Sequence, residues 1–301
     1  MATKPGDSND SKLGSLNFQV PWFPVRELTG FKLFRFELGQ RLSWSLPTWR
    51  IINFITNKIN NNSKKFIKCG PHVRVQEALT MEFIARTTTI PVPRVLDVFS
   101  IKENVYIVQE RIKGPILEDV WYLLSPDEQR SCMLQIKDCF DQLRSLTPAA
   151  GSDSERVQAV DGSGLIDSRV GQGVWGPFEN HDEFHRHLNH PILRELHERY
   201  PALQEPLAKV AGKKYRSVFS HGDFGPHNLI WVDGKGKGKG KGKIVVIDWE
   251  RAGWFPEYWD YTRVYAARWY MKEWCDLFSA VVDRYDDELE VQDRIDEYFE
   301  R

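Results

Sequence analysis

Short apolar runs separated by polar turns dominate the chain between residues 50 and 110. These runs are rich in Val, Ile, Phe and Tyr, the residues that are enriched in β-strands. The predicted strands are Arg50–Thr56, Lys65–Cys69, Val95–Phe99 and Asn104–Gln109. Residues 75–86 instead repeat apolar side chains at helical spacing. We therefore expect a small lobe of strands with a single helix.

The predicted helix 75–86 carries an acid within its apolar face. The face itself is formed by Ala78, Met81, Ile84 and Ala85. Glu77 falls among them, and an unpaired buried charge is strongly destabilising. Lys68, in the preceding strand, is the nearest candidate cation. The alternative is that Glu77 reaches solvent at the start of the helix. For Lys68, the rarity of buried lysine favours an exposed strand face.

The chain becomes helical after residue 117. A helix is expected over 127–146, a long loop over 147–175, and further helices over 191–212 and after Asp260. Asn180 and Glu183 have the spacing of a capping box. The helix that they begin contains four histidines, His181, His185, His187 and His190. Histidines at i and i+4 can bind a metal, but without an HExxH pattern a solvated helix is the better interpretation.

Two further apolar runs flank a glycine–lysine repeat at 234–243 and predict a β-hairpin. Leu229–Val232 and Ile244–Ile247 would pair antiparallel, with Leu229 opposite Ile247. This register places Asn228 opposite Asp248 at the open end of the hairpin. Asp223 lies in the turn just before. The long repeat should leave this end unchanged, because lengthening a flexible loop costs only about 0.6 kcal/mol per doubling.

Two carboxylates and a carboxamide at one end of a hairpin suit phosphoryl transfer. Such chemistry needs a metal to neutralise phosphate charge and a carboxylate beside the attacking hydroxyl. Asp223 would be that catalytic carboxylate, and Asn228 and Asp248 would hold Mg²⁺ through oxygen ligands. Lys68 would pair the nucleotide phosphates, kept in place by Glu77.

Composition limits the partners and the compartment. The 41 basic and 42 acidic residues nearly cancel, which argues against nucleic acid or an anionic membrane as partner. No apolar run is long enough to span a membrane. The polar N-terminus lacks the pattern of a secretory signal, and the four cysteines form no CxxC pair. These features predict a cytoplasmic protein with free thiols; its oligomeric state is unknown from the sequence.

Longer motifs resemble those of the aminoglycoside phosphotransferase and choline kinase-like family. The resemblance rests on HGD at residues 221–223, Asn228, and IDWE at 247–250. The downstream AGW-PEYWD segment at 252–260, IPVP at 90–93 and QERI at 109–112 extend it over most of residues 60–270. The core motif is specific, whereas a lone HxD would not be.

The resemblance implies an α+β, two-lobed protein-kinase-like fold with ATP bound between the lobes. Residues 16–113 would be the nucleotide-binding lobe with its antiparallel sheet, and 114–301 the mainly helical catalytic and acceptor lobe. Residues 1–15 are polar with little apolar content, which by itself predicts a disordered tail. The resemblance assigns the same roles to Asp223, Asn228, Asp248, Lys68 and Glu77. Backbone groups near Glu110 and Ile112 would contact adenine.

The expected activity is Mg²⁺-dependent transfer of the ATP γ-phosphoryl group to a hydroxyl of a small-molecule acceptor. One departure keeps an alternative open. No glycine-rich loop precedes Lys68, so the chain could be a catalytically degenerate nucleotide- or metabolite-binding protein. A protein kinase is disfavoured, because HRD, DFG and an APE-like segment are missing. Glu250, Trp254, Trp259 and Asp260 fit an acceptor site and lobe packing equally well.

Overall fold

The computed structural model describes residues 26–27, 64–70, 72–101, 104–148, 154–188, 201–234 and 240–299. The predicted strand at 50–56, the predicted tail at 1–15 and the middle of the glycine–lysine repeat lie outside these ranges. Within them, no helix is both long enough and apolar enough to cross a membrane.

The first lobe is a four-stranded sheet with the order β1-β3-β4-β2. Its strands are β1 (Arg26–Glu27), β2 (Lys65–Cys69), β3 (Val95–Ile101) and β4 (Asn104–Glu110). The pairs β2–β4 and β3–β4 are antiparallel, whereas the short β1 runs parallel to β3. The three predicted strands that fall within the described ranges are therefore confirmed, to within two residues at each end.

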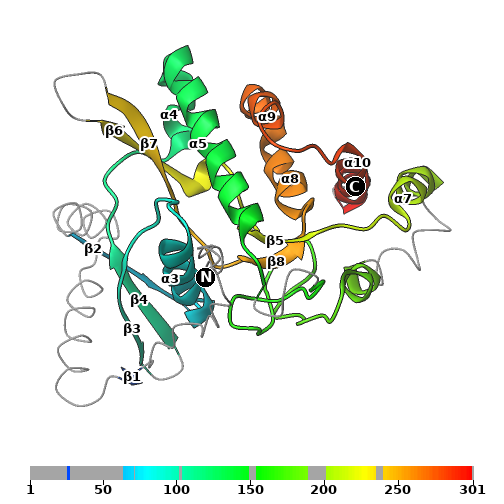
Figure 1. Cartoon of the computed structure of the whole chain (residues 1–301), viewed down its shortest axis with the longest axis horizontal. Coiled ribbons are helices and arrows are strands. Elements are labelled where there is room, and N and C mark those ends of the chain that lie inside the picture. The colour runs from blue at the N-terminus through cyan, green and yellow to red at the C-terminus, as the bar shows by residue number, and fades with distance from the viewer. Residues whose placement is uncertain are drawn as a thin grey trace, which may run out of the picture.

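Helix α3 (Val75–Thr87) packs against this sheet through the predicted apolar face (Figure 1). Ala78, Met81 and Ile84 are almost completely buried, and Glu77 is buried with them. Ala85 is exposed, contrary to the predicted face, because the helix also turns Phe83 toward the core. The acid on the apolar face is thus a real feature of the fold.

The second part of the chain is mainly helical (Figure 1). Its helices are α4 (Leu117–Val120), α5 (Pro126–Ser145), α7 (Gln204–Val210), α8 (Trp259–Val264), α9 (Lys272–Ser279) and α10 (Asp286–Phe299). Short 3₁₀ segments are η1 (Trp121–Leu123), η2 (Pro201–Leu203), η3 (Pro226–Asn228) and η4 (Tyr265–Trp269). Residues 181–188 are also helical. The Asn180 side chain accepts the Glu183 N–H, as the capping pattern predicts.

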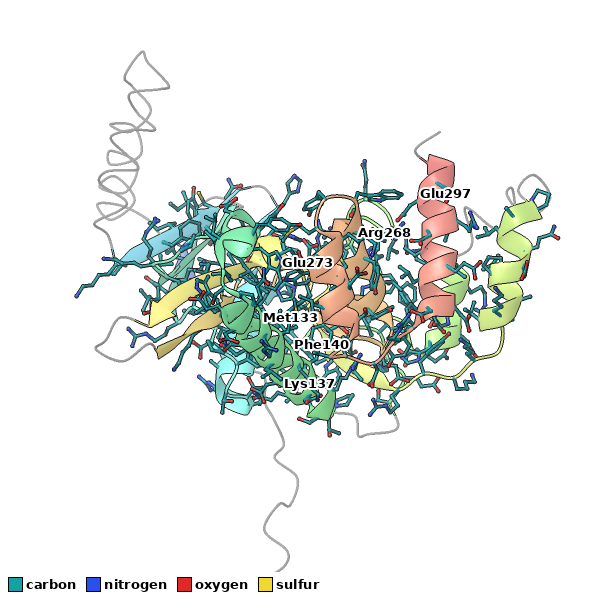
Figure 2. The ribbon with its side chains drawn as sticks, turned by 90° about the horizontal axis from the view of Figure 1, so that it is seen from above. Met133, Lys137, Phe140, Arg268, Glu273 and Glu297 are labelled. Atoms are coloured by element: carbon teal, nitrogen blue, oxygen red, sulfur yellow. The ribbon has the colours of Figure 1, made fainter. Side chains whose placement is uncertain are left out.

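Helix α5 connects the two parts of the molecule. It begins with a complete capping box between Ser125 and Glu128. In Figure 2 it lies between the sheets and the C-terminal helices, with Met133 and Phe140 labelled. The Phe140 ring contacts Phe224 and Phe278 edge-on. One continuous core of buried side chains therefore runs from α3 through α5 to α9.

Two small antiparallel pairs carry the candidate site. The first pairs β5 (Ser217–Ser220) with β8 (Gly253–Pro256). The second is the predicted hairpin, β6 (Leu229–Gly234) with β7 (Gly240–Val246). Its register differs by one residue from the prediction, because Leu229 lies opposite Val246 and Ile230 opposite Val245.

The physical reason for this register lies at Asp248. Its φ of 64° takes the chain out of the strand conformation just after Ile247. The Ile247 N–H donates to the Asn228 carbonyl at 3.0 Å, which closes the ladder there. Asn228 therefore faces Ile247, and Asp248 turns away from the hairpin axis.

The segment that leaves the first lobe is fastened to this hairpin. The Trp231 N–H donates to the Pro115 carbonyl at 2.9 Å, and Ile116 forms a bridge with Ile230. At Gly114, any side chain would collide with the Trp231 backbone. This close approach fixes the end of β4 relative to the hairpin.

Candidate active site

The loop that carries Asp223 follows β5 directly and is held by its backbone. Asp260, at the start of α8, accepts the N–H of His221 at 2.9 Å and that of Gly222 at 2.8 Å. The fully buried His221 ring accepts the Asp223 N–H through Nδ1. Its Nε2 therefore carries the proton that it donates to the Ile247 carbonyl at 3.0 Å. The loop is tied both to α8 and to the end of the hairpin.

Gly222 has a specific reason to be glycine. Its φ of 80° is in the left-handed region, and an added Cβ would collide with the Arg251 carbonyl. Arg169, from the segment predicted as a long loop, closes the same region from the other side. Its guanidinium pairs with the buried Asp167, lies 3.8 Å from the centre of the Trp259 ring, and donates to Thr262.

Asn228 and Asp248 stand on either side of this loop. The Asn228 side chain is buried, and its Nδ2 donates to the Asp223 carbonyl at 2.9 Å. Its Oδ1 is the end of the carboxamide that can face a cation. Asp248 is partly exposed and turns toward the first lobe, where its Oδ1 accepts from Lys68 Nζ at 2.6 Å.

Lys68 lies at the centre of three carboxylates. Its Nζ is 2.8 Å from Glu77 Oε2, 2.6 Å from Asp248 Oδ1 and 3.0 Å from Glu250 Oε2. Only 22% of the Lys68 side chain is exposed, so the expectation of a solvent-facing lysine is wrong. Its strand is short and lies at one edge of the four-stranded sheet, and the buried acid on α3 captures its ammonium group. The alternative of a solvated Glu77 is wrong for the same reason.

Burial and charge act differently on the cation and the buried acid of this cluster. Burial alone would lower the pKa of Lys68, but the charges of Glu77 and Asp248 outweigh it and raise that pKa above its usual value. Burial raises the pKa of Glu77 to about 7, although the positive charge of Lys68 opposes that rise. Three carboxyl groups therefore surround one ammonium group, and the most buried of them is the one that burial pushes toward its neutral form.

Asp223 has cationic neighbours instead. Its Oδ1 accepts from Arg263 Nε at 2.7 Å, and its Oδ2 lies 3.6 Å from Arg251 Nη1. His227 Nε2 is 3.7 Å from Oδ1. Burial alone would raise the pKa of Asp223. Hydrogen bonding to His227 and the two guanidinium charges outweigh it and hold that pKa well below its usual value. The carboxylate therefore stays ionised.

Residues 71–298 match the APH phosphotransferase enzyme family. The chain is a member of this family. No curated protein matches the sequence. Among solved structures, APH(2")-IIia in complex with GDP and kanamycin is 13% identical, with 84% of this chain and 97% of that chain covered at a TM-score of 0.50. This likeness shows the shared kinase-like fold.

Two other solved structures match with lower TM-scores. ADP-bound aminoglycoside phosphotransferase APH(2'')-Ib is 16% identical, with 79% of this chain and 78% of that chain covered and a TM-score of 0.47. A choline/ethanolamine kinase family protein from Mesorhizobium loti is 12% identical, with coverages of 73% and 63% and a TM-score of 0.40.

In this phosphotransferase family member, the expected adenine-contacting residues lie where β4 ends. The Glu110 N–H donates to the Arg94 carbonyl and the Arg111 N–H to the Lys64 carbonyl. Within the described residues, no partner is recorded for the Ile112 N–H. Because Gly114 is fastened to the hairpin two residues later, this segment and the Asp248 end belong to one connected framework.

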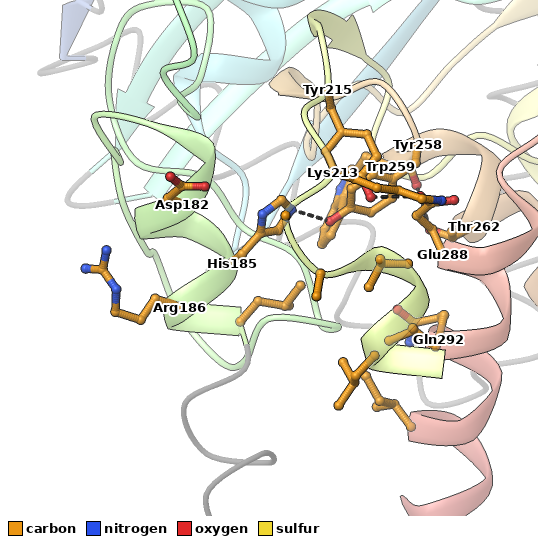
Figure 3. A pocket seen from close by; sticks show the side chains of 17 residues that line it. Asp182, His185, Arg186, Lys213, Tyr215, Tyr258, Trp259, Thr262, Glu288 and Gln292 are labelled. Carbon is orange, nitrogen blue, oxygen red and sulfur yellow. Dashed lines mark hydrogen bonds and ion pairs between the residues drawn. The ribbon is translucent and has the colours of Figure 1, made fainter. Parts of the chain in front are cut away.

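A sizeable cavity lies elsewhere in the molecule. It has a volume of about 510 Å³ and opens between the helical residues 181–188, α7, α8 and α10 (Figure 3). Within it, His185 hydrogen-bonds Tyr258 at 2.9 Å and Tyr215 donates to Glu288 at 2.7 Å. Neither Asp223 nor any residue predicted to bind the nucleotide or the metal lines it, but Trp259, an alternative acceptor-site residue, does. The candidate active site is therefore defined by its side-chain cluster rather than by this cavity.

The structure also shows the surroundings of the residues that fitted an acceptor site and lobe packing equally well. Trp254 and Trp259 are both buried and pack in the core, and Trp259 also lines the cavity described above. Asp260 is buried as well and accepts two backbone hydrogen bonds from the loop that carries Asp223. Glu250 is the third acid on Lys68, and His227 contacts Asp223.

Arg251 and Arg263 were missed from the sequence. A signal for Arg263 was present, because Asp260 and Arg263 stand three residues apart and thus share one face of α8.

Proposed function

We propose that this protein transfers the γ-phosphoryl group of ATP to a hydroxyl group of a small-molecule acceptor, with Mg²⁺. The observation that carries the proposal is the joining of two distant segments. Lys68 of the first lobe contacts Asp248, 180 residues later, beside the loop that holds Asp223. A phosphoryl-transfer enzyme needs its phosphate-binding cation, its metal ligand and its base on one framework. The first lobe would bind the nucleotide, and the reaction would take place in the cytoplasm.

Asp223 is proposed as the catalytic base. The acceptor oxygen forms a bond to the γ-phosphorus, the bond from that phosphorus to the β–γ bridging oxygen breaks, and ADP leaves with the electron pair. Asp223 takes up the proton from the acceptor hydroxyl. A carboxylate with a lowered pKa is a weak base, so the main role of Asp223 is to orient the acceptor hydroxyl while the carboxylate remains ionised. Loose phosphoryl-transfer transition states require little more of the base.

Asn228 and Asp248 fit a Mg²⁺ ion by their donor chemistry. Carboxylate and carboxamide oxygens are the protein ligands that Mg²⁺ prefers. Asn228 directs its amide nitrogen to the Asp223 carbonyl, which leaves its oxygen as the ligand end. When bound, the ion would neutralise phosphate charge. The acidic cluster around Lys68 supports this assignment, because three carboxylates would repel a triphosphate without a divalent cation.

Lys68 and the end of β4 complete the proposed nucleotide site. Lys68 would exchange its contact with Asp248 for the α- and β-phosphates, while Glu77 retains its hold on the ammonium group. The Glu110 carbonyl and the Ile112 N–H would recognise the adenine edge. Glu77 is only 1% exposed. A carboxyl group packed in this way stays beside the ammonium group of Lys68, which suits the proposed anchoring role.

The proposal is tested by ADP release over a panel of hydroxylated small molecules, with Mg²⁺ or with EDTA. We expect turnover only with Mg²⁺, and a loss of at least about tenfold in Mg·ATP affinity for Asp248→Asn, because one charged metal ligand is removed. Asp276→Asn is the matched control, because Asp276 is an exposed acid that pairs with Lys272 on α9. Binding of Mg·ATP without ADP release from any acceptor would instead indicate a degenerate binding protein.

A further inference from the structure

Two guanidinium groups lie against the carboxylate of Asp223, and one of them also lies near Glu250. Arg263 and Arg251 approach the two oxygens of Asp223, and His227 lies nearby. Tyr270 and Glu118 belong to the same electrostatic neighbourhood, since both Asp223 and Glu118 influence the pKa of Tyr270. No ion pair is recorded between Glu118 and either arginine within the described residues. Arg251 Nε lies 4.0 Å from Glu250 Oε1, so Arg251 is shared between two carboxylates, whereas Arg263 contacts Asp223.

Arg251 is held in place without a full set of partners. Its backbone carbonyl lies against Gly222, which fixes its position beside the loop. Its Nη1 is buried and makes no hydrogen bond, being 3.6 Å from Asp223 Oδ2. A buried donor without an acceptor is unfavourable, and proteins rarely keep one without a reason. This nitrogen lies on the Oδ2 side of Asp223, the carboxylate that is proposed to orient the acceptor hydroxyl.

Arg263 also has unused hydrogen-bonding capacity. It lies on the face of α8 that Asp260 fastens to the loop, so its direction is fixed. Its Nε contacts Asp223, and no partner of its two terminal nitrogens is recorded among the described residues. Paired guanidinium nitrogens bind carboxylate and phosphate groups in a bidentate manner. Together the two arginines offer an anion site next to the proposed base.

We propose that the acceptor is anionic: a hydroxylated compound whose carboxylate or phosphate group binds Arg251 and Arg263, with its hydroxyl at Asp223. This inference rests on the proposed phosphotransferase function and narrows its substrate class. A polyamine acceptor would meet two positive charges beside the reacting hydroxyl. An acidic acceptor would satisfy the unpaired Arg251 nitrogen. The transfer step itself is the one written above, with the proton going to Asp223 and ADP leaving.

The test uses acceptors that share one scaffold and differ in charge. Glycerate and glycerol phosphate supply the carboxylate and phosphate, glycerol is neutral, and 3-aminopropane-1,2-diol is cationic. Each is measured by ADP release and, independently of turnover, by the thermal shift that it gives the full-length protein. We expect kcat/KM for at least one of the two anions to exceed that for the neutral and cationic compounds by at least about tenfold. Only the anionic compounds should raise the melting temperature of the protein.

Arg263→Gln should abolish the difference in kcat/KM between the anions and glycerol. It should also abolish the rise in melting temperature that the anions cause. Arg268→Gln is the matched control, because Arg268 (labelled in Figure 2) pairs with Asp293 instead. Preference for glycerol or the amine, or an anion preference that survives Arg263→Gln, would overturn the inference. Anion-dependent shifts without any ADP release would leave the anion site standing and refute the phosphotransferase function.

Discussion

Glu77 shows how a single residue can define a site before its partners are known. An acid in the middle of an apolar helix face needs a cation, and this argument pointed to Lys68 from the sequence. The same argument could not identify Asp248 and Glu250 as further partners of Lys68, because both lie about 180 residues away from it along the chain. The buried carboxylate fixes one side of the ammonium group, and the two partly exposed acids occupy the side that a nucleotide would take.

Glu77→Gln should show that Glu77 positions Lys68 for activity without stabilising the folded protein. The substitution removes the charge but keeps the shape, so Lys68 should shift toward Asp248 and Glu250. We expect kcat to fall by at least about tenfold, as for other losses of electrostatic preorganisation. The melting temperature should hold or rise, since burial penalises the charged Glu77. Steady-state kinetics and thermal unfolding measure both.

The control for this change is Glu82→Gln on the same helix. Glu82 pairs with the exposed Arg86, and surface pairs of this kind contribute little. Glu82→Gln should therefore leave kcat unaltered. Full activity of the Glu77 variant would show that Lys68 needs no buried anchor.

The arginines mark the limit of residue-level prediction. Arg251 follows the IDWE motif directly, but nothing in its neighbours says that its side chain turns back to Asp223. That direction depends on how Gly222 packs against the Arg251 backbone. Asp260 was equally ambiguous, because an acid among aromatic residues fits a pocket and a backbone brace alike.

At the scale of elements, β2, β3, β4 and the hairpin were predictable because local pattern and tertiary environment agree, whereas the short strands β1, β5 and β8 were not predicted. The hairpin register was off by one residue. The ladder ends where Asp248 adopts a positive φ, a conformation that a non-glycine residue rarely takes and that apolar patterning does not reveal. The sequence of 147–175 predicts only a long loop, yet Arg169 within it hydrogen-bonds both α8 and the loop that carries Asp223.

The helical residues 181–188 make stability depend on pH. Burial lowers the pKa of both His181 and His185 from 6.5 to about 4. Between these values the unfolded chain binds protons that the folded protein excludes. The free energy of unfolding should therefore fall as the pH drops from about 6.5 to about 4, by on the order of 3 kcal/mol for each histidine.

His181→Leu tests this dependence by denaturant titration at several pH values. His181 is 3% exposed, and its Nε2 has no hydrogen-bond partner. An apolar replacement should cost little at neutral pH and flatten the decline in acid. His187→Leu, at an exposed position of the same helix, is the control and should keep the wild-type slope. An unchanged slope in His181→Leu would contradict the assignment.

Across the whole molecule, two regions of opposite charge meet at the candidate site. The acidic cluster around Lys68 suits a divalent cation with a nucleotide, and the arginines at Asp223 suit an anionic acceptor. Glu250 and Arg251 are adjacent in sequence and stand at the boundary between the regions. The two-lobed fold followed from the order of strands and helices. This division of charge did not, because it depends on side chains from α3, α8 and both sides of the hairpin.

The most direct measurement follows the γ-phosphoryl group itself. Labelled ATP is incubated with Mg²⁺ and the best acceptor of the panel, and label transfer is compared between the wild-type protein and Asp223→Asn. Calorimetry should show similar Mg·ATP affinity for both. The account predicts transfer by the wild type and a rate about 10²–10⁴-fold lower in the variant. This is the range by which a general base typically accelerates a reaction. Equal transfer by both proteins, or label that never leaves ATP in the wild type, would contradict it.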